Sequence, residues 1–285
     1  MPVFSPEVFV PCDARVGEGP VVEQAAGRLL FVDIPRGRLL RADLRESGPA
    51  TEVARVGMSL GAVGTRRGGG WVAACAAGFG FLGTDGSLAV EHPILADPAL
   101  RMNDAKCDSA GRFWAGSTEL DFTPGRGALH CWDPETGVRT VVEGLTLPNG
   151  LGWSPDDTVF YLADSIRRVV LTSTFDVRNG TIGRLSELIH IDDGLPDGLC
   201  VDEDGCLWLA VWSTGEVRRY DPRGRLMATV RFPVSQPSSC AFGPGGVLYV
   251  TSARQEVDPG REPLAGSVFA VDVGVGGAPV GVFEG

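Results

Sequence analysis

Short apolar stretches, most of them introduced by glycine or aspartate, recur in pairs along the whole chain. The first pair is Gly27-Arg-Leu-Leu-Phe-Val-Asp33 and Gly37-Arg-Leu-Leu-Arg-Ala-Asp43. Five similar pairs follow, at 70–75 and 80–86, 111–116 and 127–134, 157–164 and 169–176, 205–212 and 215–222, and 246–251 and 266–272. Branched and aromatic residues between turn-forming residues are typical of β-strands, and no stretch keeps a helical period between caps. We therefore predict an all-β protein with little helix.

A second pattern predicts how these strands are arranged. One position, just before the first apolar strand of each unit, recurs every 42 to 48 residues and is occupied by Glu18, Gly61, Asn103, Asn149, Asp197 and Ser239. A repeat of this length is the signature of a repeat architecture. Six units of four strands predict that residues 1–285 form a single domain, a six-bladed β-propeller with four-stranded blades. The first strand of each blade lines the central channel, so the six positions should meet near the axis.

Two of these positions lie in near-identical stretches, Pro148-Asn149-Gly150-Leu151 and Pro196-Asp197-Gly198-Leu199. Taken singly, each stretch is an ordinary turn signal. Together with Glu18 and Asn103, however, they would bring only oxygen ligands and two formal negative charges to the axis. Such a set suits a hard divalent cation such as Ca²⁺, Mg²⁺ or Mn²⁺. We therefore predict a metal site on the central axis.

Composition excludes several other kinds of partner. The formal net charge is −11 and the longest basic run is Arg66-Arg67, which argues against nucleic-acid binding. No apolar run approaches the length of a membrane span, and the N-terminus lacks the features of a signal peptide. The seven cysteines form no Cys-x-x-Cys pair, which is typical of buried free thiols in a reducing compartment. We predict a cytoplasmic protein that binds neither nucleic acid nor membrane and is a monomer or a weak oligomer.

Over essentially its full length the chain resembles the senescence-marker-protein/regucalcin/gluconolactonase family. The stretches that carry the resemblance, in family order and spacing, are Gly17-Glu18-Gly19-Pro20, Arg101-Met102-Asn103-Asp104, Pro148–Leu151, Pro196–Leu199, Thr251-Ser252-Ala253-Arg254 and Pro263-Leu264-Ala265-Gly266. The resemblance implies one catalytic divalent metal ion (Ca, Mn, Zn, Mg or Fe), with the ligands Glu18, Asn149 and Asp197. It also implies that Asp197 is a candidate base. A sugar lactone would be contacted by Arg101, Asn103 and Asp121, the last of which lies in the substrate-facing stretch 119–122.

The implied activity is the opening of sugar-acid lactones, because a bound dication polarises a carbonyl group and activates water. The chain departs from the family pattern at Ala105, at Ser117-Thr118 and at Ser267. These departures bear on the choice of substrate rather than on the ligands. Two alternatives stay open: a calcium- or metal-binding propeller without turnover, and an organophosphate hydrolase of similar fold.

Two further motifs are read as chance matches. Gly57-Met-Ser59-Leu-Gly61 matches the nucleophile elbow of serine hydrolases, but that motif needs a strand, a sharp turn and a helix, and no helical pattern follows it here. Gly78-Phe-Gly80-Phe-Leu-Gly83 matches the dinucleotide fingerprint, but a turn follows it in place of a helix N-terminus.

Overall fold

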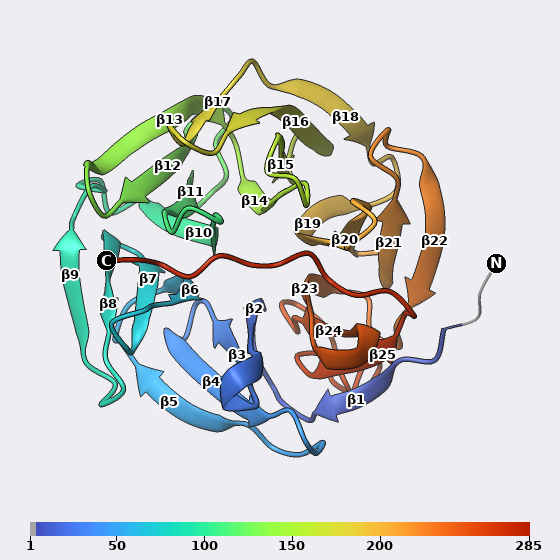
Figure 1. Cartoon of the computed structure of the whole chain (residues 1–285). Coiled ribbons are helices and arrows are strands. Elements are labelled where there is room, and N and C mark those ends of the chain that lie inside the picture. The colour runs from blue at the N-terminus through green and yellow to red at the C-terminus, as the bar shows by residue number, and fades with distance from the viewer. Residues whose placement is uncertain (1–3) are drawn as a thin grey trace.

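A computed structural model describes residues 4–285 and shows them as a ring of six antiparallel sheets (Figure 1). This confirms the predicted all-β, six-bladed β-propeller. Helix in these residues is limited to two 3-10 turns, η1 (Gln24–Ala26) and η2 (Pro244–Gly246). Neither has the length and apolarity that a membrane-spanning helix needs.

The first three blades follow the chain in order, each running from the axis outwards. The strands of blade 1 are β2 (Gly17–Glu23), β3 (Arg28–Asp33), β4 (Arg38–Asp43) and β5 (Thr51–Arg55). Those of blade 2 are β6 (Leu60–Thr65), β7 (Trp71–Cys75), β8 (Gly78–Leu82) and β9 (Leu88–His92). Those of blade 3 are β10 (Leu100–Cys107), β11 (Phe113–Glu119), β12 (Gly127–Asp133) and β13 (Gly137–Leu145).

The other three blades complete the ring, and the last of them closes it. The strands of blade 4 are β14 (Pro148–Trp153), β15 (Val159–Asp164), β16 (Val169–Asp176), the short additional β17 (Thr181–Ile182) and β18 (Ser186–His190). Those of blade 5 are β19 (Leu195–Val201), β20 (Leu207–Trp212), β21 (Glu216–Tyr220) and β22 (Leu226–Arg231). Blade 6 consists of β23 (Pro237–Phe242), β24 (Val247–Ser252), β25 (Val268–Asp272) and the N-terminal strand β1 (Glu7–Val10), which pairs with β25.

The repeated polar position was predicted to precede the first strand of each blade, and here the prediction was wrong. In the structure the position lies inside the innermost strand, for example inside β14 and β19. The glycine that follows serves close packing rather than a turn, because a Cβ atom on Gly150 would overlap the backbone of Leu199. A Cβ atom on Gly198 would likewise overlap Ser239. The inner strands therefore approach one another more closely than side chains would allow.

Each innermost strand is interrupted at the repeated position. Its pairing with the second strand shifts register there, between Glu18 and Val21, Leu60 and Ala62, Met102 and Ala105, Pro148 and Leu151, Pro196 and Leu199, and Pro237 and Ser239. A β-bulge leaves a residue out of the regular alternation and re-aims its side chain. Six bulges at equivalent places explain how residues so distant in sequence face one axis.

Buried aspartates hold the other ends of two inner strands. Asp202, after β19, accepts hydrogen bonds from the Cys206 amide at 2.8 Å and from Trp208 Nε1 at 2.9 Å. Asp108, after β10, accepts an equivalent bond from Trp114 Nε1 at 2.9 Å. Each carboxylate is fully buried and joins a turn to the tryptophan of the next strand. These aspartates are thus structural, because backbone and indole donors satisfy them.

The C-terminal residues cross the ring at the ends of the inner strands. In Figure 1 they run, in red, from β25 across the centre to the C-terminus beside β8. The tail bonds to blade 5 through the Ala278 amide and the Val201 carbonyl (2.9 Å), and to blade 2 through the Phe283 amide and the Thr65 carbonyl (2.8 Å). Phe283 is fully buried. The tail therefore fastens blades on opposite sides of the ring.

All seven cysteines are unpaired, and six of them are buried, as predicted; Cys12 is half-buried. The Sγ atoms of Cys200 and Cys240, on neighbouring inner strands, lie 3.5 Å apart.

Candidate metal and substrate site

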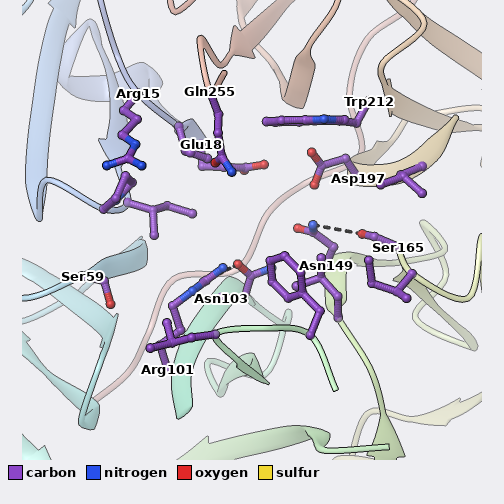
Figure 2. A pocket seen from close by; sticks show the side chains of 18 residues that line it. Arg15, Glu18, Ser59, Arg101, Asn103, Asn149, Ser165, Asp197, Trp212 and Gln255 are labelled. Carbon is purple, nitrogen blue, oxygen red and sulfur yellow. Dashed lines mark hydrogen bonds between the residues drawn. The ribbon is translucent and has the colours of Figure 1, made fainter. Parts of the chain in front are cut away.

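The predicted side chains gather around one cavity at the axis. The cavity has a volume of about 530 Å³, and Glu18, Arg101, Asn103, Asn149 and Asp197 are among the residues that line it (Figure 2). They come from the inner strands of blades 1, 3, 4 and 5. The two remaining repeat positions, occupied by glycine and serine, are not part of the lining.

Glu18 and Asp197 form a buried pair of carboxyl groups. Both are almost fully buried, and they lie close enough to shift each other's pKa. Burial, followed by the charges of Asp197 and Asp104, raises the pKa of Glu18 well above its ordinary value. Burial and the charge of Asp104 raise the pKa of Asp197 in the same way. Like charges at this depth repel unless a proton or a cation lies between them.

Two acceptor oxygens of this cavity have no hydrogen-bond partner among the described residues: Oδ1 of Asn149 and Oδ1 of Asp197. The amide of Asn149 is held in place by its Nδ2, which donates to Ser165 Oγ at 3.2 Å, so the oxygen faces away from that bond. A buried acceptor without a partner is costly, and an ion is one of its ordinary explanations. Figure 2 shows Glu18, Asn149 and Asp197 arranged around a common space.

The residues present fit a hard dication. Within residues 4–285 no three His, Cys, Asp or Glu side chains gather as a metal site. The predicted set instead has two carboxylates and one amide oxygen, and its charge balances that of a dication. Oxygen-only ligands of this kind suit Ca²⁺, Mg²⁺ or Mn²⁺. The ligand roles of Glu18, Asn149 and Asp197 remain a prediction that this geometry favours.

Arg101 and Asn103 form a second, linked pair among the residues that line the cavity. Arg101 Nη1 donates to Asn103 Oδ1 at 2.6 Å, and Asn103 Nδ2 donates to the Pro148 carbonyl at 3.0 Å. Burial lowers the pKa of Arg101 to about 10, while the nearby charges of Glu18 and Asp197 oppose the shift. The guanidinium therefore stays charged at neutral pH and presents donors to the cavity.

Asp121, predicted to contact substrate, does not line the cavity. Its side chain is exposed and accepts a hydrogen bond from Thr123 Oγ1 at 3.0 Å, which lowers the pKa of Asp121. Its neighbours Leu120 and Phe122 line the cavity instead. Phe122 has φ 58°, a conformation that costs a bulky residue about 1–3 kcal/mol. Substrate contact by Asp121 stays a prediction.

Asp104 is a third buried carboxylate that the sequence interpretation did not single out. Burial raises the pKa of Asp104, and the charge of Lys106 opposes that shift. The Asp104 charge in turn acts on both Glu18 and Asp197. The sequence feature that could have identified Asp104 is its place directly after Asn103, at the repeated position. In the structure both residues lie in the bulge of β10.

Two fully buried aspartates hold the loops that lead to the predicted ligands. Asp164, at the end of β15, accepts hydrogen bonds from the backbone amides of Thr146 and Leu147, each at 3.0 Å. This loop leads directly into Asn149. Asp33, at the end of β3, accepts bonds from the amides just before β2, at 3.2 and 3.3 Å. Both carboxylates thus orient a ligand through its backbone.

In the described chain, neither of the two chance motifs is followed by a helix, as the sequence predicted. Ser59 lines the cavity, but the strand β6 follows it, so the helix of a nucleophile elbow is missing. The dinucleotide-like stretch lies in β8 and the turn after it.

Comparison with known proteins gives consistent matches. A family model described as "SMP-30/Gluconolactonase/LRE-like region" matches residues 16–254. The chain is 35% identical to regucalcin of Macaca fascicularis over 282 residues, 93% of each chain. Among solved structures, a calcium-binding protein, regucalcin, from Agrobacterium tumefaciens matches with a TM-score of 0.93 and 26% identity over 100% of both chains. A luciferin-regenerating enzyme matches with a TM-score of 0.90 and 27% identity over 98% of this chain and 99% of that one.

Proposed function

The chain belongs to the SMP-30/gluconolactonase/LRE-like family, as its sequence motifs predicted, and on this premise we propose that it is a divalent-metal-dependent lactonase that opens sugar-acid lactones. One observation carries the proposal. Oδ1 of Asn149 and Oδ1 of Asp197 are buried without a hydrogen-bond partner among the described residues, in the cavity that Glu18 also lines. This arrangement supports a cation with one side open to substrate.

A dication bound there would polarise the lactone carbonyl and lower the pKa of a water molecule. In the proposed reaction the oxygen of water bonds to the carbonyl carbon and the ring C–O bond breaks. One proton ends on the ring oxygen, and the product is a hydroxy acid. The carboxylate of Asp197 would take a proton from the attacking water. Arg101, oriented by Asn103, would donate to the substrate oxygens and to the carboxylate product.

A second candidate function is metal binding without turnover. It is favoured by the similar protein from Agrobacterium tumefaciens, which is described as calcium-binding. The same ligands would serve both functions, so only a measurement of turnover distinguishes them. We further propose that the protein is cytoplasmic and acts without nucleic acid or membrane, which its acidic charge and unpaired cysteines support.

The test is the opening of D-glucono-1,5-lactone, followed by the release of acid. We expect a rate above that in buffer, a loss of this rate after chelation, and recovery with one or more of Ca²⁺, Mn²⁺, Zn²⁺, Mg²⁺ or Fe²⁺. Asp197→Asn should lower kcat/KM by at least about 100-fold. A matched control is Asp192→Asn, since that side chain is 94% exposed. Metal binding with no lactone opened would favour the second candidate, and a wild-type rate in Asp197→Asn would contradict the site.

A further inference from the structure

The wall of the cavity differs in polarity from one side to the other. Over blades 6, 1 and 2 it is mixed, with the polar side chains of Gln255, Arg15 and Ser59 beside the apolar residues Val16, Ile34 and Pro35. Over blades 3, 4 and 5 the wall is largely apolar: apart from the predicted site residues and Ser165, it consists of Leu120, Phe122, Leu147, Ile166, Leu195 and Trp212. Figure 2 shows Arg15 and Ser59 across the cavity from Trp212.

The apolar side offers few hydrogen-bonding groups to a ligand. Apart from the predicted site residues, its polar groups are the indole N–H of Trp212 and the hydroxyl of Ser165, which is 2% exposed and already accepts the hydrogen bond from Asn149. A ligand group that points past the predicted site residues toward blades 3, 4 and 5 therefore meets mostly carbon.

This apolar side is also open to water. Leu120 is 58% exposed and Ile166 is 38% exposed, which places both among the few large hydrophobic residues left exposed in the described chain. Phe122 lines the same side in a backbone conformation that L-residues rarely adopt, with φ 58°. Strained and exposed apolar residues around a cavity are typical of a binding surface.

We propose that the cavity takes lactones whose ring carries an alkyl or aryl arm, with the arm on the apolar wall of blades 3, 4 and 5. This inference rests on the proposed lactonase function and adds a substrate class to it. The reaction is the same hydrolysis: water adds across the ring ester bond and gives a hydroxy acid that keeps its apolar arm. The polar side chains of Arg15, Ser59 and Gln255 on the opposite side face the ring oxygens.

The wall fits an apolar arm better than the hydroxyl groups of a sugar. A hydroxyl pressed against the leucine, isoleucine and phenylalanine side chains of this wall would lose its hydrogen bonds to water and gain none, which weakens binding. A methylene group in the same place gains about fourfold in affinity when it leaves water. If three methylenes become buried, the expected gain is roughly 50-fold.

The test compares three six-membered lactones with the metal-loaded protein: δ-valerolactone, δ-decanolactone and D-glucono-1,5-lactone. We expect kcat/KM for δ-decanolactone to exceed that for δ-valerolactone by roughly 50-fold. Calorimetry adds a readout without turnover. The product 5-hydroxydecanoate should bind more tightly than 5-hydroxypentanoate by a similar factor.

The wall is tested with the double variant Leu120→Ser/Ile166→Ser, whose sites are exposed enough to leave folding intact. The double variant should reduce two ratios at least fivefold: the ratio of kcat/KM for δ-decanolactone to that for δ-valerolactone, and the ratio of the affinities for 5-hydroxydecanoate and 5-hydroxypentanoate. The matched control is Leu226→Ser/Val280→Ser, which removes two apolar side chains that are 51% and 62% exposed and lie away from the cavity. The control should keep the wild-type ratios.

The outcomes separate the two claims. If D-glucono-1,5-lactone is opened but neither ratio exceeds twofold, the apolar-arm inference is wrong and the lactonase proposal stands. If no lactone is opened but 5-hydroxydecanoate binds preferentially, the lactonase proposal fails and the apolar wall remains a ligand site. Ratios that survive in the Leu120→Ser/Ile166→Ser variant would overturn the assignment to this wall.

Discussion

At the scale of single residues, the buried carboxyl groups of the cavity lower the stability of the metal-free protein at neutral pH. Glu18, Asp104 and Asp197 are three buried carboxyl groups whose pKa values are all raised, mainly by burial. The folded protein holds these protons to higher pH than the unfolded chain does. Without a cation, the contribution of these groups to stability is therefore present at acidic pH and is lost as pH rises through their raised values.

Asp197→Asn should consequently stabilise the metal-free protein at pH 7. The amide carries no charge to repel Glu18, and Tm should rise by about 2–4 °C for each kcal/mol of repulsion removed. In the wild type, a cation at 100 times its Kd should add about 2.7 kcal/mol, and the variant should lose this increment. Thermal unfolding with chelator and with added Ca²⁺ measures both effects. A lower Tm of the metal-free variant would indicate an ordinary hydrogen-bonded aspartate instead.

His130 should make the fold sensitive to acid. Its ring lies between Ser117 Oγ at 2.9 Å and Thr140 Oγ1 at 3.1 Å, and burial lowers the pKa of His130 to about 4. The unfolded chain binds this proton near pH 6.5, so stability should fall between pH 6.5 and 4, by up to about 3 kcal/mol.

Urea unfolding at pH 7 and pH 4.5 tests this dependence. His130→Gln should lose about 2 kcal/mol less than the wild type over that interval. His190→Gln, at a side chain that is 50% exposed, should behave as the wild type. Equal losses in all three proteins would show that His130 does not titrate as expected.

At the scale of elements, the bulged inner strand is the unit that makes the site. In blades 1 and 4 a buried aspartate at the end of the second strand holds the loop before the innermost strand, and the bulge then turns the predicted ligand toward the axis. In blade 4 these parts are Asp164, the amides of Thr146 and Leu147, and Asn149. A substitution of this aspartate should therefore change the position of the predicted ligand, although the two side chains are not in contact.

Asp164→Asn should weaken metal binding by about 10- to 100-fold. The substitution replaces one of the two carboxylate oxygens that accept hydrogen bonds from the loop before Asn149 with an amide nitrogen, which cannot accept. It should also cost about 1–3 kcal/mol of stability. The matched control is Asp202→Asn, which removes an equally buried acceptor from the far end of β19. The control should lose stability but keep the metal affinity. Calorimetric titration with Ca²⁺ compares the two variants. Equal Ca²⁺ affinities of Asp164→Asn and Asp202→Asn would contradict the positioning role of Asp164.

The sequence predicted this unit in part. The repeat located Glu18, Asn103, Asn149 and Asp197 at one cavity, because the spacing of blades is fixed by their strands. The glycines after Asn149 and Asp197 were read as part of turn signals, since the same dipeptides serve both a turn and a close approach of backbones. Which of the two applies depends on neighbouring blades, and local sequence does not contain that information.

The second and third strands of each blade were predicted, since apolar and aromatic residues recur along them between turn-forming residues. The outer strands, such as β5 and β22, were not singled out, because water covers one side and leaves a mixed pattern. The apolar wall was missed for a similar reason. Its residues come from five separate segments, and only the folded ring brings them together.

At the scale of the whole molecule, the C-terminal tail should contribute to stability from outside the blades. Phe283 packs against Trp132, with ring centroids 4.7 Å apart, and against Phe81 at 6.1 Å. Phe283→Ala should lower the free energy of unfolding by about 3–5 kcal/mol. Val280→Ala, at a tail residue that is 62% exposed, should change it by less than about 0.5 kcal/mol. Urea unfolding compares them, and similar values would mean that the tail is only loosely attached.

The pairing of β1 with β25 has a consequence for how each new copy is made. Val8 leaves the ribosome long before its partner Phe269, because all the other blades are synthesised between them. Until β25 has been made, β1 lacks its partner strand and presents a bare backbone edge that a nascent neighbour could join. The blade that closes the ring is therefore the one most open to mispairing with a second copy during synthesis.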